Sequence, residues 1–390
     1  MTVANRALLT TASLIFGSVL SSTLLIPAVR PFMALRVPGN ESAAHAFMAV
    51  SLLGAVLAAP LALSVSRRFG NSSRLVSGIA LLDAGALLCL TLVANLNAIL
   101  ALRFVQGGLN LILLSILLGA ARSSASERSG SRYGLLGAAM MLAVALGSPL
   151  GALCLSFGPI APLVVACALE LLVALATPLA RLENVAPDEA VTEPRPWLPM
   201  CWVFAERLAI GLFVVTFAFH GRQCLGLSDA AIGLRISAFM LPFVAAVHPA
   251  GRLSDHVGAA PLAIAGLTLY GLAWFVLRVA DSTQLLFALA LLGLTSAAVF
   301  AAAMREAGAS RGVAARIRAM SALNSAGSLG MLLGTAGAGI VSAVLRSRGA
   351  APDSTHGVVF ATAGTVQLAA AFATAALFSV LGRAMRLVRS

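Results

Sequence analysis

The sequence predicts an all-α membrane protein with twelve transmembrane helices in two pseudosymmetric six-helix halves. First, 60% of the 390 residues are hydrophobic and only 10% are charged, so the chain cannot present a polar surface all round. Second, apolar runs of about twenty residues, enough to cross a hydrocarbon layer about 30 Å thick, recur along the chain. Third, a polar, proline-rich segment interrupts this pattern near the middle.

Each apolar run predicts one membrane-spanning helix. The first run is too long for a signal peptide and is followed directly by others, so we expect it to remain as the first span. The twelve runs cover approximately residues 7–29, 45–65, 75–96, 98–120, 134–157, 160–180, 198–219, 230–247, 261–279, 285–303, 320–345 and 358–381.

The interruption lies at "RLENVAPDEAVTEPRPWLP", residues 181–199, where proline and acidic residues accumulate and the apolar periodicity stops. Such a composition is typical of a linker. The sequence therefore predicts an N-terminal half at residues 1–180, a linker at 181–197 and a C-terminal half at 198–390.

The distribution of arginine predicts how the chain is oriented in the membrane, because all 26 basic residues are arginine. Most of them fall in the termini and in the loops that lie on the same side as the termini. Six fall in loops on the other side: Arg30, Arg36, Arg222, Arg278, Arg346 and Arg348. We therefore expect both termini to be cytoplasmic, in a multi-pass protein of a bacterial inner membrane. The net charge of +12 then reflects topology and attraction to anionic lipid, so we expect no nucleic-acid partner.

The sequence argues against an enzyme. Without lysine the chain has no Walker A motif and cannot itself be an ATP-driven pump. The segment Gly308–Gly312 fits G-x-S-x-G but lies between two membrane spans, without the strand and turn that expose a nucleophile. The five histidines show no metal-ligand spacing, and the five cysteines form no disulfide framework. We expect no metal and no cofactor.

A polar segment follows the eighth apolar run. "PAGRLSDHVG", Pro249–Gly258, corresponds to "PLALSVSRRFG", Pro60–Gly70, after the second run. Glycine at Gly251 and Gly258 suits a tight turn or a close approach of two backbones. Asp255 can accept hydrogen bonds from amides at a helix N-terminus and pair with an arginine of the other half.

The segment Pro249–Gly258 resembles the loop signature G-x-L-[AS]-D-x-x-G of the major facilitator superfamily. The twelve spans, the cytoplasmic termini and the central linker agree with that family over the whole chain. The resemblance implies the major facilitator fold, alternating access by rocking of the two halves, and a latch that holds the cytoplasmic gate shut. In that latch Asp255 would reach the start of the fifth span, where Arg132 is the expected partner; a turn with a solvated acid is the alternative.

The first copy of the segment departs from this signature. It ends in Arg67, Arg68 and Gly70, with Leu63 at the glycine position and Arg67 at the acid position. Two arginines near the start of the eleventh span would face Arg67: Arg316 and Arg318. Because like charges repel, we expect one of the two interlocks to be missing and the gate to open more easily.

The fourth span contains "LRFVQGG", Leu102–Gly108. An arginine within a span is costly unless it is paired or faces water, and Gln106 shares the face of Arg103. The segment resembles the R-x-x-Q-G signature of the drug:proton antiporter branch of the superfamily, with Arg103, Gln106 and Gly107 in place. The resemblance implies that Arg103 lines the cavity and helps to couple proton and substrate movement; a structural ion pair within the first half is the alternative.

The fifth span contains "GSPLGA", Gly147–Ala152, in which Pro149 lies between Gly147 and Gly151. We expect the proline to kink the helix and the glycines to allow close packing. The segment resembles the Gly-Pro-x-x-Gly-Gly motif of the antiporter branch, but its spacing is one residue short and Ala152 replaces the last glycine.

Six charges lie within spans: Asp83, Glu170, Glu206, Arg103, Arg207 and Arg235. Three acids and three bases indicate pairing. Burial favours the neutral form of a carboxyl, so these acids are also the plausible proton carriers. The resemblance places the first, fourth, seventh and tenth spans around the cavity, so we rank Glu206 first, then Asp83 and Glu170. A purely structural role is the alternative for each.

The sequence thus favours proton-coupled export of a small amphipathic compound. Residues 7–29 contain no acid, although many exporters of this branch have one in the first span. Uptake or facilitated transport of a specific small metabolite or organic anion therefore stays open, as does a non-transporting receptor. The expected partners are a small-molecule substrate, protons and the bilayer, and we expect a monomer.

Overall fold

The computed structural model describes all residues except 1–2, 41, 123–127, 187–196, 282, 350 and 390. The described residues form twelve long α-helices and one short 3₁₀ turn, without a strand. All twelve helices are long and apolar enough to cross a membrane. Both the helical fold class and the number of spans are therefore confirmed.

The helices, with their bounds, are α1 (Val3–Arg36), α2 (Ser42–Phe69), α3 (Ser72–Leu92), α4 (Leu96–Gly119), α5 (Ser129–Leu155), α6 (Ala161–Ala176), α7 (Trp197–Gln223), α8 (Asp229–Val257), α9 (Ala259–Val279), α10 (Leu285–Gly308), α11 (Val313–Ser347) and α12 (Pro352–Arg389). The 3₁₀ turn η1 (Thr177–Ala180) extends α6.

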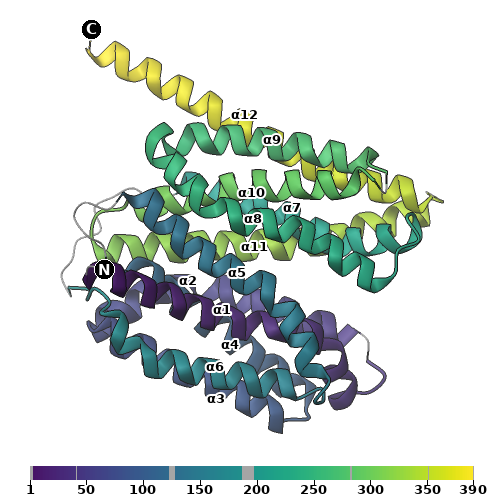
Figure 1. The fold of residues 1–390 in the computed structure, drawn as a ribbon, viewed down its shortest axis with the longest axis horizontal. Coiled ribbons are helices and arrows are strands. Elements are labelled where there is room, and N and C mark those ends of the chain that lie inside the picture. Colours follow the sequence, from purple (N-terminus) through teal and green to yellow (C-terminus); the bar gives the residue numbers. More distant parts are fainter. Residues whose placement is uncertain are drawn as a thin grey trace.

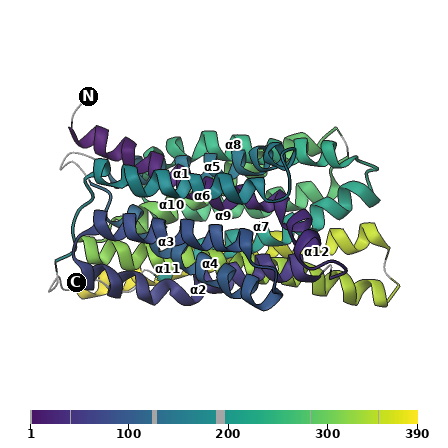
Figure 2. The same ribbon diagram turned by 90° about the horizontal axis from the view of Figure 1, so that it is seen from below.

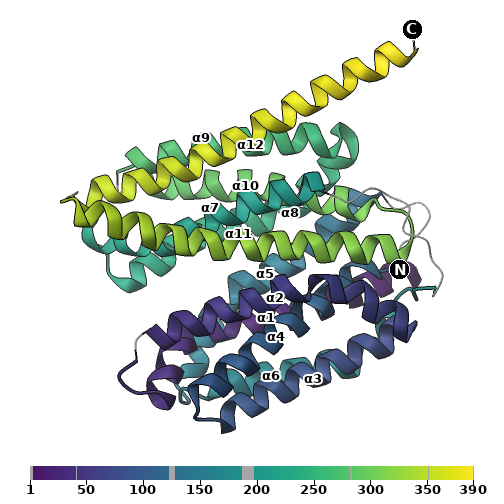
Figure 3. The ribbon, with the colours of Figure 1, turned by 180° about the vertical axis from the view of Figure 1, so that it is seen from behind.

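Helices α1–α6 pack together as one group and α7–α12 as another (Figure 1). The groups meet along two seams, α5 against α8 and α2 against α11; Figure 3 shows the second seam from behind. Both termini lie at one end of the bundle, which we call the linker end, and all helices run roughly along its long axis (Figures 1 and 2). The predicted linker at 181–197 lies mostly outside the described residues, so the boundaries of the halves stay a prediction.

Several helices are longer than the apolar runs. The segment Pro249–Gly258, expected to be a loop, is helical as far as Val257, and α2 likewise continues to Phe69. Both expectations of a loop were wrong. Hydropathy reports where the chain leaves hydrocarbon, whereas the backbone hydrogen bonds of a helix continue into the headgroup region and beyond. The turns are therefore very short, and Gly70 and Gly258 form them with positive φ angles of 66° and 93°.

Glycines bring neighbouring helices into backbone contact within each half. Side chains added at Gly54 or Gly107 would overlap backbone atoms of the facing helix in the α2–α4 pair. Side chains added at Gly330 or Gly334 of α11 would likewise overlap backbone atoms of α7. Small residues allow such close approach where lipid supplies no hydrophobic driving force between helices. The glycine of R-x-x-Q-G thus has a packing role against α2.

The two halves also touch through glycines, and these contacts lie toward the linker end. Gly130 of α5 meets Gly251 of α8, and Gly119 of α4 meets Ile317 of α11. Gly308 of α10 lies against the ring of Tyr133. The halves diverge toward the opposite end in Figures 1 and 3. The structure is therefore closed at the linker end.

Candidate functional site: buried charges and the linker-end gate

Glu206 lies midway along α7 with its side chain fully buried in the C-terminal half. Ser296 of α10 donates a hydrogen bond of 2.6 Å to its Oε1, and Arg207 Nε lies 3.3 Å from its Oε2. Tyr270, from α9, lies near enough for Glu206 to act electrostatically on its hydroxyl group. The carboxyl that the sequence ranked first is thus enclosed by three helices, with one cation beside it.

Arg207 projects from a different face of α7 than Glu206, because adjacent residues do not share a helix face, although its Nε still reaches the carboxylate. Its Nη2 contacts Met141 Sδ of α5 at 3.7 Å, and its guanidinium lies 5.1 Å from the centre of the Phe300 ring. The Arg207 side chain is 18% exposed, whereas that of Glu206 is 0% exposed. The arginine therefore sits at the surface between the two halves and reaches back to the buried acid.

A second group of polar side chains is enclosed within the N-terminal half. Asp83 of α3 is fully buried and interacts electrostatically with Arg103 and Gln106 of α4 and with Glu170 of α6. Arg103 donates a hydrogen bond to Gln106 Oε1, and its guanidinium lies 4.8 Å from the Phe47 ring centre. Asp83 therefore has an arginine and a second acid as buried neighbours inside this half.

The second acid, Glu170, is held by α1. Ser21 donates a hydrogen bond of 2.6 Å to Glu170 Oε1, and Ser18 interacts with the same carboxyl. The Ser18 hydroxyl in turn accepts a hydrogen bond of 3.3 Å from Asn110 of α4, a half-buried residue. The buried group thus continues through hydroxyls to a partly accessible amide.

Two of the arginines within spans lie apart from Glu206. Arg103 is only 5% exposed and packs on Phe47 of α2, so it is enclosed within the N-terminal half, and its place in the cavity stays a prediction. Arg235 of α8 donates to its own helix, at Ala231 O, over 3.4 Å. The structure thus brings Glu206 and Arg207 together, and Asp83, Glu170, Arg103 and Gln106 together, as two separate groups.

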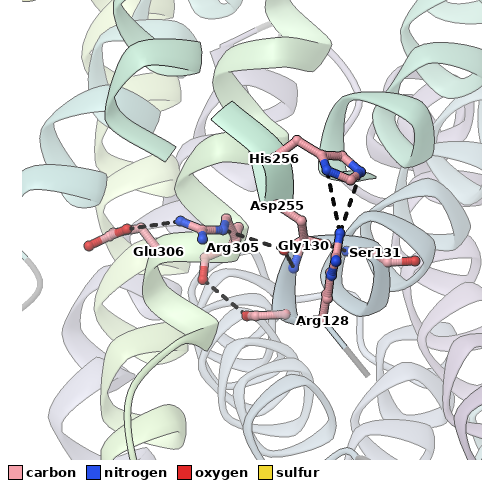
Figure 4. A network of polar contacts seen from close by, with 8 residues as sticks. Arg128, Gly130, Ser131, Asp255, His256, Arg305 and Glu306 are labelled. Atoms are coloured by element: carbon pink, nitrogen blue, oxygen red, sulfur yellow. Dashed lines mark hydrogen bonds and ion pairs between the residues drawn. The ribbon is translucent and has the colours of Figure 1, made fainter. Parts of the chain in front are cut away.

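At the linker end Asp255 joins the halves, as Figure 4 shows. Its carboxylate accepts hydrogen bonds from the amides of Gly130 and Ser131 at 2.7 and 2.8 Å, at the start of α5. Arg305 of α10 lies 3.5 Å away as its ion-pair partner. The carboxylate is favoured there because unpaired amides and the helix dipole place positive charge at an N-terminus.

The prediction that Arg132 pairs with Asp255 was wrong. Arg132 Nη2 donates to Ala121 O at 2.8 Å and to the Tyr133 hydroxyl at 3.0 Å, within its own half. The cation beside Asp255 is instead Arg305, from the same half as the acid. Gly251 makes the bond to the amides possible, because its backbone touches Gly130.

The second seam has an interlock that the sequence analysis did not expect. Arg316, at the start of α11, donates from Nε to Gly119 O at 2.8 Å and forms an ion pair with Glu183. Glu183 follows η1 and is anchored to the N-terminal half, since its amide donates to Ala120 O and its carbonyl accepts from Ser72. The expectation that an arginine at Arg67 leaves this seam without an interlock was therefore wrong.

We expect Glu183→Gln to loosen this seam without unfolding the protein. The ion pair is partly buried, with side-chain exposures of 12% and 28%, so its loss should cost on the order of 1 kcal/mol of the closed state, roughly a fivefold shift in population. Maleimide labelling of Ser321→Cys, buried between α2 and α11, reports the opening in a background without the native cysteines. Glu306→Gln, whose acid pairs within one half, is the matched control; equal labelling rates in both variants would contradict the prediction.

The proline segment of α5 packs against α1. The helix runs without interruption through Pro149, and a side chain at Gly147 would overlap Thr23 while one at Gly151 would overlap Leu24. The Thr23 hydroxyl also donates to Ala143 O, a carbonyl of α5, at 3.1 Å. Close packing of the glycines is thus present; the kink stays a prediction.

Sequence reasoning missed four contributors to these sites: Ser296, Tyr270, Arg305 and Glu183. Ser296 and Tyr270 look like ordinary polar residues in apolar runs, and nothing in the sequence links them to α7. Arg305 counted only toward topology. Glu183 looked like part of a solvated linker, and its nearness to the end of the sixth span was the signal available.

The profile of the Major Facilitator Superfamily matches residues 11–221 and 201–385 of this chain. Among solved structures, the human organic anion transporter MFSD10 (TETRAN) is similar with a TM-score of 0.75 and 16% identity, covering 96% of this chain and 100% of that one. The proton:xylose symporter XylE has a TM-score of 0.70 and 15% identity, covering 95% and 94%. The E. coli fucose:proton symporter FucP has a TM-score of 0.65 and 14% identity, covering 94% and 98%.

No curated protein sequence matches the chain. At these identities the solved structures show the fold alone. The family and its structural neighbours indicate a transporter rather than an enzyme. Twelve spans, two six-helix halves and a sequence match over most of the chain agree, and the chain belongs to the major facilitator superfamily.

Proposed function

We propose that this protein is a secondary active transporter that couples the movement of a small amphipathic compound to protons, with Glu206 as the proton carrier. The arginine bias supports a cytoplasmic linker end, and in that orientation the structure is closed to the cytoplasm. Rocking of the halves about the two seams would then expose the centre to either side. A monomer in a bacterial inner membrane is part of the same proposal.

The observation that carries the proposal is the enclosure of Glu206 beside Arg207. A fully buried carboxylate is stable only while a cation or hydrogen bonds compensate its charge. Arg207 supplies that charge from the surface between the halves, where rearrangement during transport would alter the pairing. Loss of the arginine would favour uptake of a proton by Glu206, so the pair can link protonation to conformation.

The direction of transport has two candidates. The resemblance of Leu102–Gly108 to the antiporter signature favours export in exchange for protons. Uptake of a metabolite or organic anion is favoured by the burial of Arg103 away from the inter-half surface and by the lack of an acid in α1. The similar structures include an organic anion transporter and two proton symporters, which supports the second candidate.

Accumulation of a panel of positively and negatively charged dyes in cells lacking their own pumps tests the proposal. The protein should change the accumulation of at least one dye, and a protonophore should abolish the change. We expect Glu206→Gln, which fixes the neutral form, to lower the effect at least about tenfold because the proton can no longer be exchanged.

Asp281→Asn is the matched control, since it removes an exposed acid between α9 and α10 and should leave the effect unchanged. A change in accumulation that persists with the protonophore or in Glu206→Gln would contradict proton coupling through this residue.

A further inference from the structure

Resting on the proposed function, we infer that the substrate is an amphipathic organic anion whose charged group binds Arg207, and that it crosses the membrane together with the proton.

The accessible charge at the centre of the molecule is positive. The three acids at mid-depth, Asp83, Glu170 and Glu206, are each 0% exposed. Arg207 keeps 18% of its side chain exposed between the halves. A cation arriving there would meet a guanidinium and no exposed carboxylate, whereas an anion would meet an opposite charge.

Apart from its pairing with Glu206, the Arg207 guanidinium contacts two apolar side chains. The guanidinium lies between the thioether of Met141 on α5 and the ring of Phe300 on α10, so it contacts both halves. A planar guanidinium binds carboxylate or sulfonate groups through two parallel hydrogen bonds, while Met and Phe side chains accommodate an apolar body. An organic acid with an aromatic or aliphatic body fits this combination.

The same guanidinium also pairs with Glu206. This shared partner determines whether a proton and an anion favour or oppose each other's binding. The charged or titratable groups that face Glu206 among the described residues are Arg207 of its own helix and Tyr270 of α9, with the Ser296 hydroxyl from α10 as a further donor. A charged Glu206 competes with a bound anion for Arg207. Protonation of Glu206 removes the competitor, so proton and anion favour each other's binding, and this linkage is reciprocal.

Cooperative binding of a proton and an anion is the requirement for symport. The loaded site carries no additional net charge, because the proton neutralises Glu206 while the anion neutralises Arg207. A proton gradient directed into the cell would therefore drive uptake of the anion. Exchange, by contrast, requires proton and substrate to compete, as a cation competing for Glu206 would.

The test uses purified protein in proteoliposomes and two probes with the same ring and opposite permanent charges, benzenesulfonate and phenyltrimethylammonium. Neither probe takes up a proton itself, so any linked proton movement belongs to the protein. A pH electrode follows the lightly buffered external medium, and a radiolabel follows the probe. We expect benzenesulfonate to enter with alkalinisation of the medium, and phenyltrimethylammonium neither to enter nor to cause proton movement.

Variants test whether benzenesulfonate entry and the linked proton movement depend on Arg207 and Glu206. Arg207→Gln should lower benzenesulfonate entry at least about tenfold, since a hydrogen bond to a charged group is lost, and Arg207→Lys should restore part of it. Glu206→Gln should keep exchange of labelled for unlabelled benzenesulfonate while abolishing the linked proton movement. Asp281→Asn should match the parent in every assay.

Opposite movement of phenyltrimethylammonium and protons would overturn the inference while leaving proton-coupled transport intact. Benzenesulfonate entry that is unchanged in Arg207→Gln, or no entry at all, would likewise overturn the anion site. Transport of either probe without any linked proton movement in the parent would instead contradict the proposed function itself.

Discussion

Asp255→Ala is expected to open the linker end. The substitution removes the acceptor of two amide hydrogen bonds from α5 and the partner of Arg305. Hydrogen bonds to a charged group are worth about 1.5–3 kcal/mol each. The freed amides bind water once the seam opens, so we expect a net loss on the order of 3 kcal/mol for the closed state, roughly a 100-fold shift in population.

Distances between spin labels measure this shift. Arg122→Cys, after α4, and Arg252→Cys, on α8, are exposed positions in opposite halves at the linker end. In a background without the native cysteines, their distance distribution should gain a longer component in Asp255→Ala. Asp255→Asn retains an oxygen acceptor without the charge and should lie in between. An unchanged distribution in Asp255→Ala would show that the latch does not hold the gate.

Arg103→Ala is expected to cause the largest loss of stability. The arginine is the cation that acts on buried Asp83, and it also packs on the Phe47 ring. Removing one partner of a buried charged pair typically costs about 3–5 kcal/mol, because the other charge stays buried without compensation. Unfolding of the purified protein in mixed micelles with increasing denaturing detergent measures the loss.

Arg235→Ala is the comparison for Arg103→Ala. This arginine also lies within a span, but its described hydrogen bond goes to a carbonyl of its own helix. We expect a loss of about 1 kcal/mol, the value of an ordinary hydrogen bond. Equal losses in the two variants would mean that the group around Asp83 does not depend on its arginine.

The structure shows which helices surround the Leu102–Gly108 segment, and the sequence pattern did not predict them. Gln106 indeed shares a face with Arg103, as helical spacing requires, and Gly107 lies against α2. Yet the segment is enclosed with two acids from α3 and α6. Spacing along one helix predicts which residues share a face, but not which neighbouring helix that face meets.

The polar segment before Gly258 was predictable in part. That Asp255 would accept from amides at a helix N-terminus follows from its chemistry, and the structure shows these bonds to α5. Its cation was not predictable, because Arg132 turns back toward Ala121 and Arg305 arrives from α10. Pseudosymmetry places a carboxylate near a helix end but leaves open which of several nearby arginines reaches it.

The sequence by itself determined the membrane class, the twelve spans and the family, because the thickness of a bilayer imposes a local pattern on every crossing. Tertiary structure decided which buried charges meet, which arginine completes the gate and that Glu183 closes the second seam. Those pairings join helices far apart in the chain. They depend on how closely glycine-lined backbones approach, and a sequence does not record that distance.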